Sequence, residues 1–222
     1  TFILMGTSLI TSAVIGVFFG TVAAVKKNTI VDDILTILSF IGVSIPVFFI
    51  SLLLIKRFSY DIALLPSSGM YDVRRELKGI DKILDLSKHM VLPVITLTIF
   101  QATAFIRYTR AAMIEVLDND YIKAAIAKGM SFKRVLIKHA LKNAMIPIVT
   151  IFCLQIPTLF SGALMTETVF VWPGIGRLSY EAVQNRDYPL IMGILMIGAV
   201  FILVSNLSAD ILYICIDRRI ET

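Results

Sequence analysis

The chain has 222 residues, of which 57% are hydrophobic and only 17% are charged, and its mean hydropathy is +0.85. A soluble domain carries about 25% charged residues and about 45–50% apolar ones, so this composition argues against one or two soluble domains and favours a membrane protein. The formal net charge of +5 would suit nucleic-acid binding. In a membrane protein, however, it indicates cytoplasmic loops rich in Lys and Arg.

Five apolar runs without a charged residue predict membrane-spanning helices, because a helix that crosses a bilayer needs about 20 mostly apolar residues. Gly16 and Gly20 in the first run are spaced for close approach to another helix. Gly42 and Pro46 predict a bend in the second run. The five runs are Thr1–Val25, Ile34–Ile55, Met90–Ile106, Ala144–Thr166 and Tyr188–Ala209.

The connections between the runs indicate the orientation in the membrane. The connection from Arg107 to Asn143 has eight Lys and Arg residues against three acids, whereas Lys56–His89 has seven against five. Basic connections concentrate on the cytoplasmic side, so we expect Arg107–Asn143 to be cytoplasmic and Thr1 to lie on the outer side. Within Lys56–His89, the segment Tyr71–Lys88 is predicted to form a short helix outside the bilayer.

The stretch from Asp120 to Pro147 is a long, strongly basic segment between two apolar runs. Residues 118–120 are types that favour the start of a helix, and residues 123–128 are nearly all strong helix formers. This pattern predicts a first helix on the cytoplasmic side.

Gly129 stands where that helix would end on a left-handed residue, with Met130 able to fold back on the last turn. Ser131 suits the start of a second helix, which we expect to run from Phe132 to Met145. A helix, a glycine elbow and a second helix without catalytic residues suggest a docking element. Lipid or DNA binding would also suit its basic charge.

Polar side chains inside the apolar runs are expected to face the protein interior, because lipid cannot satisfy their hydrogen bonds. Gln101 and Gln155 are predicted to face either a water-filled path or a neighbouring helix. Thr158, Ser161 and Glu167 are further candidates for a translocation path.

The segment Glu167–Leu178 follows the fourth run and contains the turn-forming pair Pro173-Gly174. Phe170 and Trp172 are aromatic residues of a kind found at membrane interfaces. Two interpretations remain open. The segment either re-enters the protein as an outer constriction or forms an interfacial loop anchored by its aromatic side chains.

Motifs for a phosphate-binding loop, a zinc hydrolase or a nucleophilic serine do not occur in the sequence. His89 and His139 fall on opposite sides of the membrane in this topology, so we expect no metal site. Cys153 and Cys215 lie in apolar surroundings, as buried thiols do. The five runs contain no acid for a proton-driven carrier. Hence no catalytic residue is expected, and the energy for any transport has to come from another protein.

The stretch Asp120–Pro147 resembles the cytoplasmic coupling motif of ABC-importer permeases, with Lys123-Ala124-Ala125 and Gly129 in the positions of Glu-Ala-Ala and Gly. Its variant DYIKAAIAKG…RVLIKHALKNAMIP is similar to the oligopeptide, dipeptide and nickel branch of that family. Further segments similar to this branch are LPSSG at Leu65–Gly69, HMVLPVITL at His89–Leu97, ETVFVWPGIGRL at Glu167–Leu178, RDYP at Arg186–Pro189 and the terminal ADILYICIDRR.

The resemblance implies an all-α, type I ABC-importer transmembrane fold over residues 1–222, multi-pass in the cytoplasmic membrane of a bacterium or archaeon. Five of a probable six spans fall in this sequence, and the first is expected to be missing. Residues 117–145 would form a cytoplasmic coupling loop within that domain. The residues implied to contact the ATPase are Asp120, Tyr121, Lys123, Ala124, Ala125, Lys128 and Gly129.

The implied function is a permease subunit that forms half of a path for oligopeptides or dipeptides, with nickel as the alternative cargo. Its implied partners are a second homologous permease chain, two cytoplasmic ATP-binding subunits, an extracytoplasmic peptide-binding protein and the lipid bilayer, but no nucleic acid. ATP and Mg would bind to the partner subunits, so this chain is expected to hold no cofactor and to be no enzyme. An ATPase-independent, channel-like membrane protein is the alternative from a different class.

Overall fold

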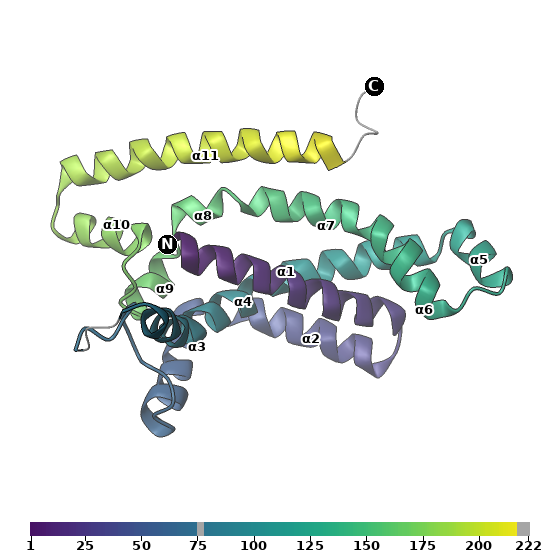
Figure 1. Cartoon of the computed structure of the whole chain (residues 1–222), viewed down its shortest axis with the longest axis horizontal. Coiled ribbons are helices and arrows are strands. Elements are labelled where there is room, and N and C mark those ends of the chain that lie inside the picture. Colours follow the sequence, from purple (N-terminus) through teal and green to yellow (C-terminus); the bar gives the residue numbers. More distant parts are fainter. Residues whose placement is uncertain (75–77, 217–222) are drawn as a thin grey trace. The chain divides into compact units, whose positions relative to one another are not determined.

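The computed structural model describes residues 1–74 and 78–216. Over this range the chain is mostly helical, and its helices follow one another along the chain as Figure 1 shows. The chain divides into two units, each assembled from separated segments. Unit 1 comprises Thr1–Leu9, Ile45–Phe100 and Ile156–Asn206, and unit 2 comprises Ile10–Ser44, Gln101–Gln155 and the chain from Leu207 onward.

Four helical stretches of the described chain are long and apolar enough to cross a membrane. The number rises to five if α2 (Ile30–Ser44) and the pair formed by α3 (Val47–Leu54) and η1 (Ile55–Asp61) are counted as one broken span. The break lies directly before α3 and includes Pro46, which confirms the predicted bend. The four stretches are Phe2–Val25, Ile80–Leu117, Phe132–Phe160 and Tyr188–Ser208.

The first and last predicted runs are confirmed as α1 (Phe2–Val25) and α11 (Tyr188–Ile216). The predicted short helix Tyr71–Lys88 is wrong as a separate element. Its second half forms the first turns of α4 (Ile80–Leu117), because nothing between Ile80 and the third apolar run interrupts a helix. Residues 71–74, 78 and 79 are not helical, and 75–77 lie outside the described residues.

The fourth predicted run, Ala144–Thr166, is interrupted near its end. Helix α7 (Lys142–Gln155) is followed by the short α8 (Thr158–Ser161), and the backbone then turns at Gly162, which has a φ of +74°. The last residues of the run belong to α9 (Leu164–Val169).

The second helix of the basic segment, predicted as Phe132–Met145, is not separate from the fourth run. The segments α6 (Phe132–Val135), η2 (Leu136–Leu141) and α7 form one continuous helical stretch. Pro147 lies inside α7 and does not end it. The span therefore begins among the basic residues.

Both aromatic residues of the segment after α9 are buried in unit 1, so the interpretation of an interfacial aromatic anchor is wrong. Phe170 and Trp172 are each 1% exposed, and Trp172 packs with Leu4, Met5 and Leu97. The backbone folds back on itself, because the Trp172 N–H donates to the Glu167 carbonyl at 2.8 Å. Helix α10 (Ile175–Gln184) follows this turn.

The close approach predicted for Gly16 and Gly20 is confirmed in unit 2, where both face α4. A Cβ on Gly16 would collide with Phe105, and a Cβ on Gly20 would lie 2.7 Å from the Ile106 carbonyl oxygen. Only glycine leaves room for these two helices at this separation.

Candidate coupling site

Helix α5 (Asp120–Ala127) starts where the sequence predicts. Asn119 takes the N-cap position in extended conformation, and its carbonyl accepts the Ile122 N–H at 3.1 Å. Its side-chain amide donates back to the Glu115 carbonyl in α4 at 3.0 Å. These bonds fix the reversal of the chain between α4 and α5.

The glycine elbow at the end of α5 is confirmed. Gly129 has a φ of +83°, and its N–H donates to the Ile126 carbonyl at 2.9 Å. The Met130 N–H donates to the Ala125 carbonyl at 3.3 Å, which completes the usual pair of bonds around a left-handed helix end. A Cβ on Gly129 would meet nothing within 4 Å, so the backbone conformation and not the lack of space favours glycine.

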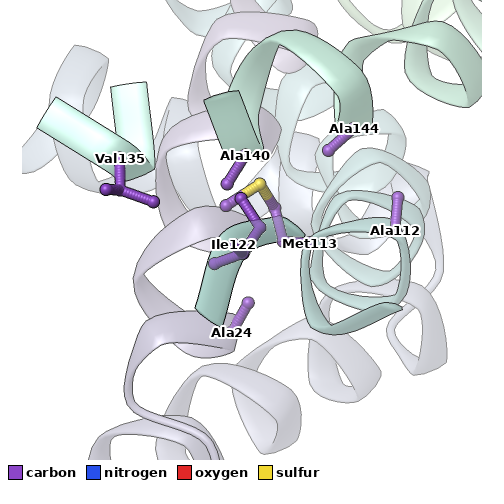
Figure 2. Packing of buried hydrophobic residues seen from close by; sticks show 7 residues of the cluster. All are labelled: Ala24, Ala112, Met113, Ile122, Val135, Ala140 and Ala144. Carbon is purple, nitrogen blue, oxygen red and sulfur yellow. The ribbon is translucent and has the colours of Figure 1, made fainter. Parts of the chain in front are cut away.

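The inner face of α5 packs on a buried cluster within unit 2, here named the α5 cluster. Ile122 is 1% exposed and points into it, and Ala125 and Met130 pack against its edge. Small side chains from α1, α4, η2 and α7 let the helices come close together around Met113. Figure 2 shows the members Ala24, Ala112, Met113, Ile122, Val135, Ala140 and Ala144.

The outer face of α5 is free of contacts with the rest of the described chain over much of its length. Asp120, Lys123, Ala124 and Lys128 are exposed, and the Lys123 ammonium lies 3.1 Å from the Asp120 carboxylate. Ala125 is half-buried against the α5 cluster. Of the two alanines, Ala124 is therefore the one that another protein can contact directly.

Tyr121 connects α5 to the helix that follows it. Its ring is 45% exposed, and its hydroxyl oxygen accepts a hydrogen bond from the Asn143 side chain at 2.8 Å. Because Asn143 lies in the first turn of α7, this bond and the Gly129 elbow tie α5 to the same helical stretch.

A bidentate ion pair beside this site was missed by the sequence analysis. Asp32 in α2 is 2% exposed and binds the Arg110 guanidinium of α4. Both residues lie just outside the predicted apolar runs, in the connections between them. Two acids before the second apolar run, Asp32 and Asp33, and two arginines after the third run, Arg107 and Arg110, were the available signals.

The residues predicted to line a translocation path fall in different units. Gln101 and Gln155 belong to unit 2, and the Gln101 side-chain oxygen accepts a hydrogen bond from Ser12 of α1 at 3.3 Å. Thr158 and Ser161 lie in α8 of unit 1, where Thr158 is exposed and the Ser161 side chain lies outside the described residues. Their role in a path stays a prediction.

Glu167, the fifth residue predicted for the path, is fully buried in unit 1. Its carboxylate accepts hydrogen bonds from the Thr1 hydroxyl at 2.9 Å and from the Arg177 N–H at 3.0 Å. The Thr1 hydroxyl oxygen in turn accepts the Ile175 N–H at 2.7 Å. The carboxylate thus lies at the N-terminus of α10, where the helix dipole favours a negative charge.

Three glycines enclose the Glu167 carboxylate. A Cβ on Gly174 would collide with it, and one on Gly176 would lie 2.9 Å from its Oε2 atom. A Cβ on Gly162 would lie 2.7 Å from the Gly176 nitrogen. This arrangement, here named the glutamate cradle, holds α9 and α10 together.

Within the described residues, no group of three or more His, Cys, Asp or Glu side chains is placed to hold a metal ion. His89 of unit 1 is buried, and its Nδ1 atom lies 2.9 Å from the Asp85 carbonyl oxygen. Cys153 is a buried free thiol in α7. The Cys215 side chain lies outside the described residues.

The fold and this site define a multi-pass α-helical membrane protein that presents a short helix for contact with another protein. Residues 16–222 match the family model described as "Binding-protein-dependent transport system inner membrane component". The chain belongs to this family and is therefore a permease subunit of an ABC importer in the inner membrane.

Relatives match the chain over nearly all of its length. The oligopeptide transport system permease protein AppB of Bacillus subtilis is 40% identical over 221 residues, which are 100% of this chain and 69% of the relative. The dipeptide transport system permease protein DppB of Escherichia coli K12 is 39% identical over 96% of this chain and 68% of its own length. DppB of Haemophilus influenzae is 40% identical over 93% of this chain and 66% of its own length.

Solved structures support the fold. A chain from inward-facing conformations of the MetNI methionine ABC transporter matches with a TM-score of 0.75 and 17% identity, covering 96% of this chain and 91% of that chain. A second crystal form of the same transporter gives a TM-score of 0.72. The chain therefore has the type I ABC-importer permease fold.

Proposed function

We propose that this chain forms half of the translocation path of an ATP-driven importer for oligopeptides or dipeptides. Support for the cargo comes from the AppB and DppB relatives, which are 39–40% identical to this chain and are named for oligopeptides and dipeptides. Nickel is the less favoured cargo, because none of these three relatives is named for nickel.

The partners proposed for this chain are a second homologous permease, two cytoplasmic ATP-binding subunits and an extracytoplasmic peptide-binding protein. ATP and Mg are proposed to bind to the ATP-binding subunits, and this chain contributes no nucleotide site of its own. In this assembly residues 117–145 act as the coupling loop, and the outer face of α5 contacts an ATPase subunit.

The observation that carries this proposal is the way α5 is held. Its inner face packs on the α5 cluster through Ile122, and its two ends are fixed by the bonds of Asn119 and Gly129. A push on the exposed face is therefore transmitted to α4 and to the stretch α6–η2–α7, which both continue into apolar spans. Packed elements of this kind move as rigid bodies between discrete states.

The test uses the transporter assembled from this chain, the second permease and the two ATP-binding subunits, in membrane vesicles loaded with ATP. The peptide-binding protein is added outside the vesicles. Labelled dipeptide and oligopeptide uptake is compared with uptake of radioactive nickel. Peptide uptake that requires ATP and the binding protein is expected. Nickel uptake without peptide uptake would contradict the proposed peptide cargo. Transport without any ATP-binding subunit would contradict the proposal of an ATP-driven importer.

The coupling contact is tested with a matched pair of variants. Ala124→Arg places a long charged side chain on the exposed face of α5, whereas Asn185→Arg adds the same charge at the exposed end of α10. Ala124→Arg is expected to reduce copurification of the ATP-binding subunit and peptide uptake together. Equal behaviour of the two variants would contradict the proposed contact.

A further inference from the structure

A basic hollow lies at the start of the stretch α6–η2–α7. Its volume is about 340 Å³, and it is lined by Ser131, Lys133, Arg134, Ile137 and Lys138. The three cationic side chains are exposed. Among the described residues, none of the three forms an ion pair with an acid, so their charge is available to an anion from outside the chain.

An apolar groove of about 610 Å³ lies within unit 2 between α1 and the stretch η2–α7. From α1, Val14 is 64% exposed and Phe18 is 62% exposed. From the other side, the groove is lined by Leu141, Met145 and Phe152, among others. Apolar side chains that are exposed on membrane-spanning helices are covered by lipid or by another apolar helix.

The hollow and the groove adjoin each other on the same helical stretch. Lys133 and Ile137 line the hollow, and the adjacent Leu136 lines the groove together with Leu141 and Met145. Ile137 lines the hollow, and Leu141 lines the groove about one turn further along. The basic surface therefore continues directly into the apolar one.

This order of charge and apolar surface matches the depth of a bilayer. The continuous stretch α6–η2–α7, Phe132–Gln155, has 24 residues, and at about 1.5 Å per residue it is about 36 Å long. The hydrocarbon core is about 30 Å thick and the bilayer with headgroups about 40–45 Å. Lys142 is the last charged residue of the stretch, so the hollow falls at headgroup depth when the groove lies in the hydrocarbon.

We propose that the hollow and the groove together bind one anionic phospholipid. Lys133, Arg134 and Lys138 contact its phosphate, and an acyl chain lies along the groove between α1 and α7. Surface contact with an acidic protein would explain the hollow alone, and packing of an apolar helix would explain the groove alone. A phospholipid accounts for both surfaces and for their order along one helical stretch.

This inference requires only that the chain spans the membrane, and it does not depend on the proposed peptide cargo. The test uses the assembled transporter, purified in mild detergent from nanodiscs with equal amounts of phosphatidylglycerol and phosphatidylcholine. Retained lipids are counted by native mass spectrometry. The wild type is expected to retain phosphatidylglycerol in excess, because a juxtamembrane basic residue strengthens binding to anionic lipid by about fivefold.

The triple variant Lys133→Gln, Arg134→Gln, Lys138→Gln is expected to lose this preference. The control Lys56→Gln, Lys78→Gln, Lys88→Gln removes the same charge from exposed residues of unit 1 and is expected to keep it. A third variant, Val149→Trp, fills the groove without changing the charge and is expected to lower retention of both lipids. A wild-type helical circular-dichroism spectrum shows that each variant chain is folded, whether or not its partner subunits stay bound.

Several outcomes would overturn the inference. If this triple variant and its control retain phosphatidylglycerol equally, the hollow does not bind the headgroup. If the triple variant keeps the lipid but loses the ATP-binding subunit, the hollow is a protein contact. If Val149→Trp releases the second permease chain and leaves lipid retention unchanged, the groove holds a partner helix instead of an acyl chain.

Discussion

Asp32 and Arg110 form a two-point ion pair between α2 and α4, with the Arg110 Nε atom 2.6 Å from Oδ1 and Nη2 2.7 Å from Oδ2 of Asp32. The Asn28 N–H also donates to the Asp32 Oδ2 atom, at 3.1 Å. The carboxylate is therefore held by both the guanidinium and the turn that joins α1 to α2. This pair therefore joins α2 to α4, the helix that contributes Ala112 and Met113 to the α5 cluster.

Asp32→Asn is expected to lower the free energy of unfolding by about 2 kcal/mol. Breaking a buried ion pair costs about 3–5 kcal/mol, but water can partly solvate the Arg110 side chain, which is 33% exposed, and this reduces the loss. The measurement is denaturant-induced unfolding in detergent micelles. As a control, Asp118→Asn breaks the exposed pair with Lys27 at 3.4 Å and is expected to cost less than about 1 kcal/mol. Equal losses for the two variants would contradict a special role for Asp32.

Gly129→Ala is expected to weaken coupling at α5. A left-handed backbone costs a residue with a side chain about 1–2 kcal/mol, and about 1.4 kcal/mol is tenfold in a population. Peptide-stimulated ATP hydrolysis by the assembled transporter should therefore fall by about five- to thirtyfold. Gly129→Asn should restore part of it, because Asn tolerates this conformation better.

Gly79→Ala is the matched control for that variant. Gly79 has a φ of +60°, and a Cβ there also meets nothing within 4 Å, so the backbone strain is comparable. It lies before α4 and away from α5 in the sequence. If Gly79→Ala reduced stimulated hydrolysis as much as Gly129→Ala, the effect would be one of stability and not of coupling.

Glu167→Gln distinguishes a structural from a path-lining role for the buried carboxylate. The amide keeps one acceptor oxygen but turns an NH₂ group toward a donor, either the Thr1 hydroxyl or the Arg177 N–H. An unsatisfied buried polar group costs about 1–3 kcal/mol, so a loss of unfolding free energy of that size is expected. Uptake per folded transporter should stay unchanged.

Gly174→Ala should destabilise the glutamate cradle more strongly than Glu167→Gln, because its Cβ would collide with the carboxylate. Gly193→Ala in α11 is the control, since its Cβ would meet nothing within 4 Å. A Glu167→Gln transporter with wild-type stability but reduced peptide uptake would instead favour the predicted place of Glu167 in the path.

Local chemistry was sufficient to predict the coupling element from the sequence. The start of α5, the left-handed Gly129 and the fold-back of Met130 each depend on a few adjacent residues. The close helix contact at Gly16 and Gly20 could also be predicted, because two glycines four residues apart lie on the same face of a helix. The kink at Pro46 follows from the chemistry of one residue.

Contacts between distant residues could not be predicted in this way. Asp32 and Arg110 are separated by 78 positions, and no local rule pairs them. The Trp172 side chain suits either the membrane–water interface or the protein interior. The backbone turn after α9 determines that it lies in the interior. Apolar composition likewise gave no sign that the fourth run breaks near Gly162, where φ is +74° and an added Cβ would lie 2.7 Å from the Gly176 nitrogen.

The packing of α1 on α4 leads to a last prediction, which concerns Gly20→Ala. An added Cβ would lie 2.6 Å from the Thr109 Cβ and 2.7 Å from the Ile106 carbonyl oxygen. Neither atom is the end of a flexible side chain, so the helices have to separate, and overpacking of this kind costs about 1–3 kcal/mol. Unfolding in detergent micelles is expected to show a loss of that size.

Gly6→Ala in the same helix provides the comparison. Its Cβ would meet nothing within 4 Å, and alanine stabilises a helix interior over glycine by about 0.5–1 kcal/mol. Gly6→Ala should therefore be neutral or slightly stabilising. Because both variants gain the same helix propensity, the difference between them isolates the cost of separating α1 from α4. Similar unfolding free energies for the two variants would show that this close approach does not limit the packing of unit 2.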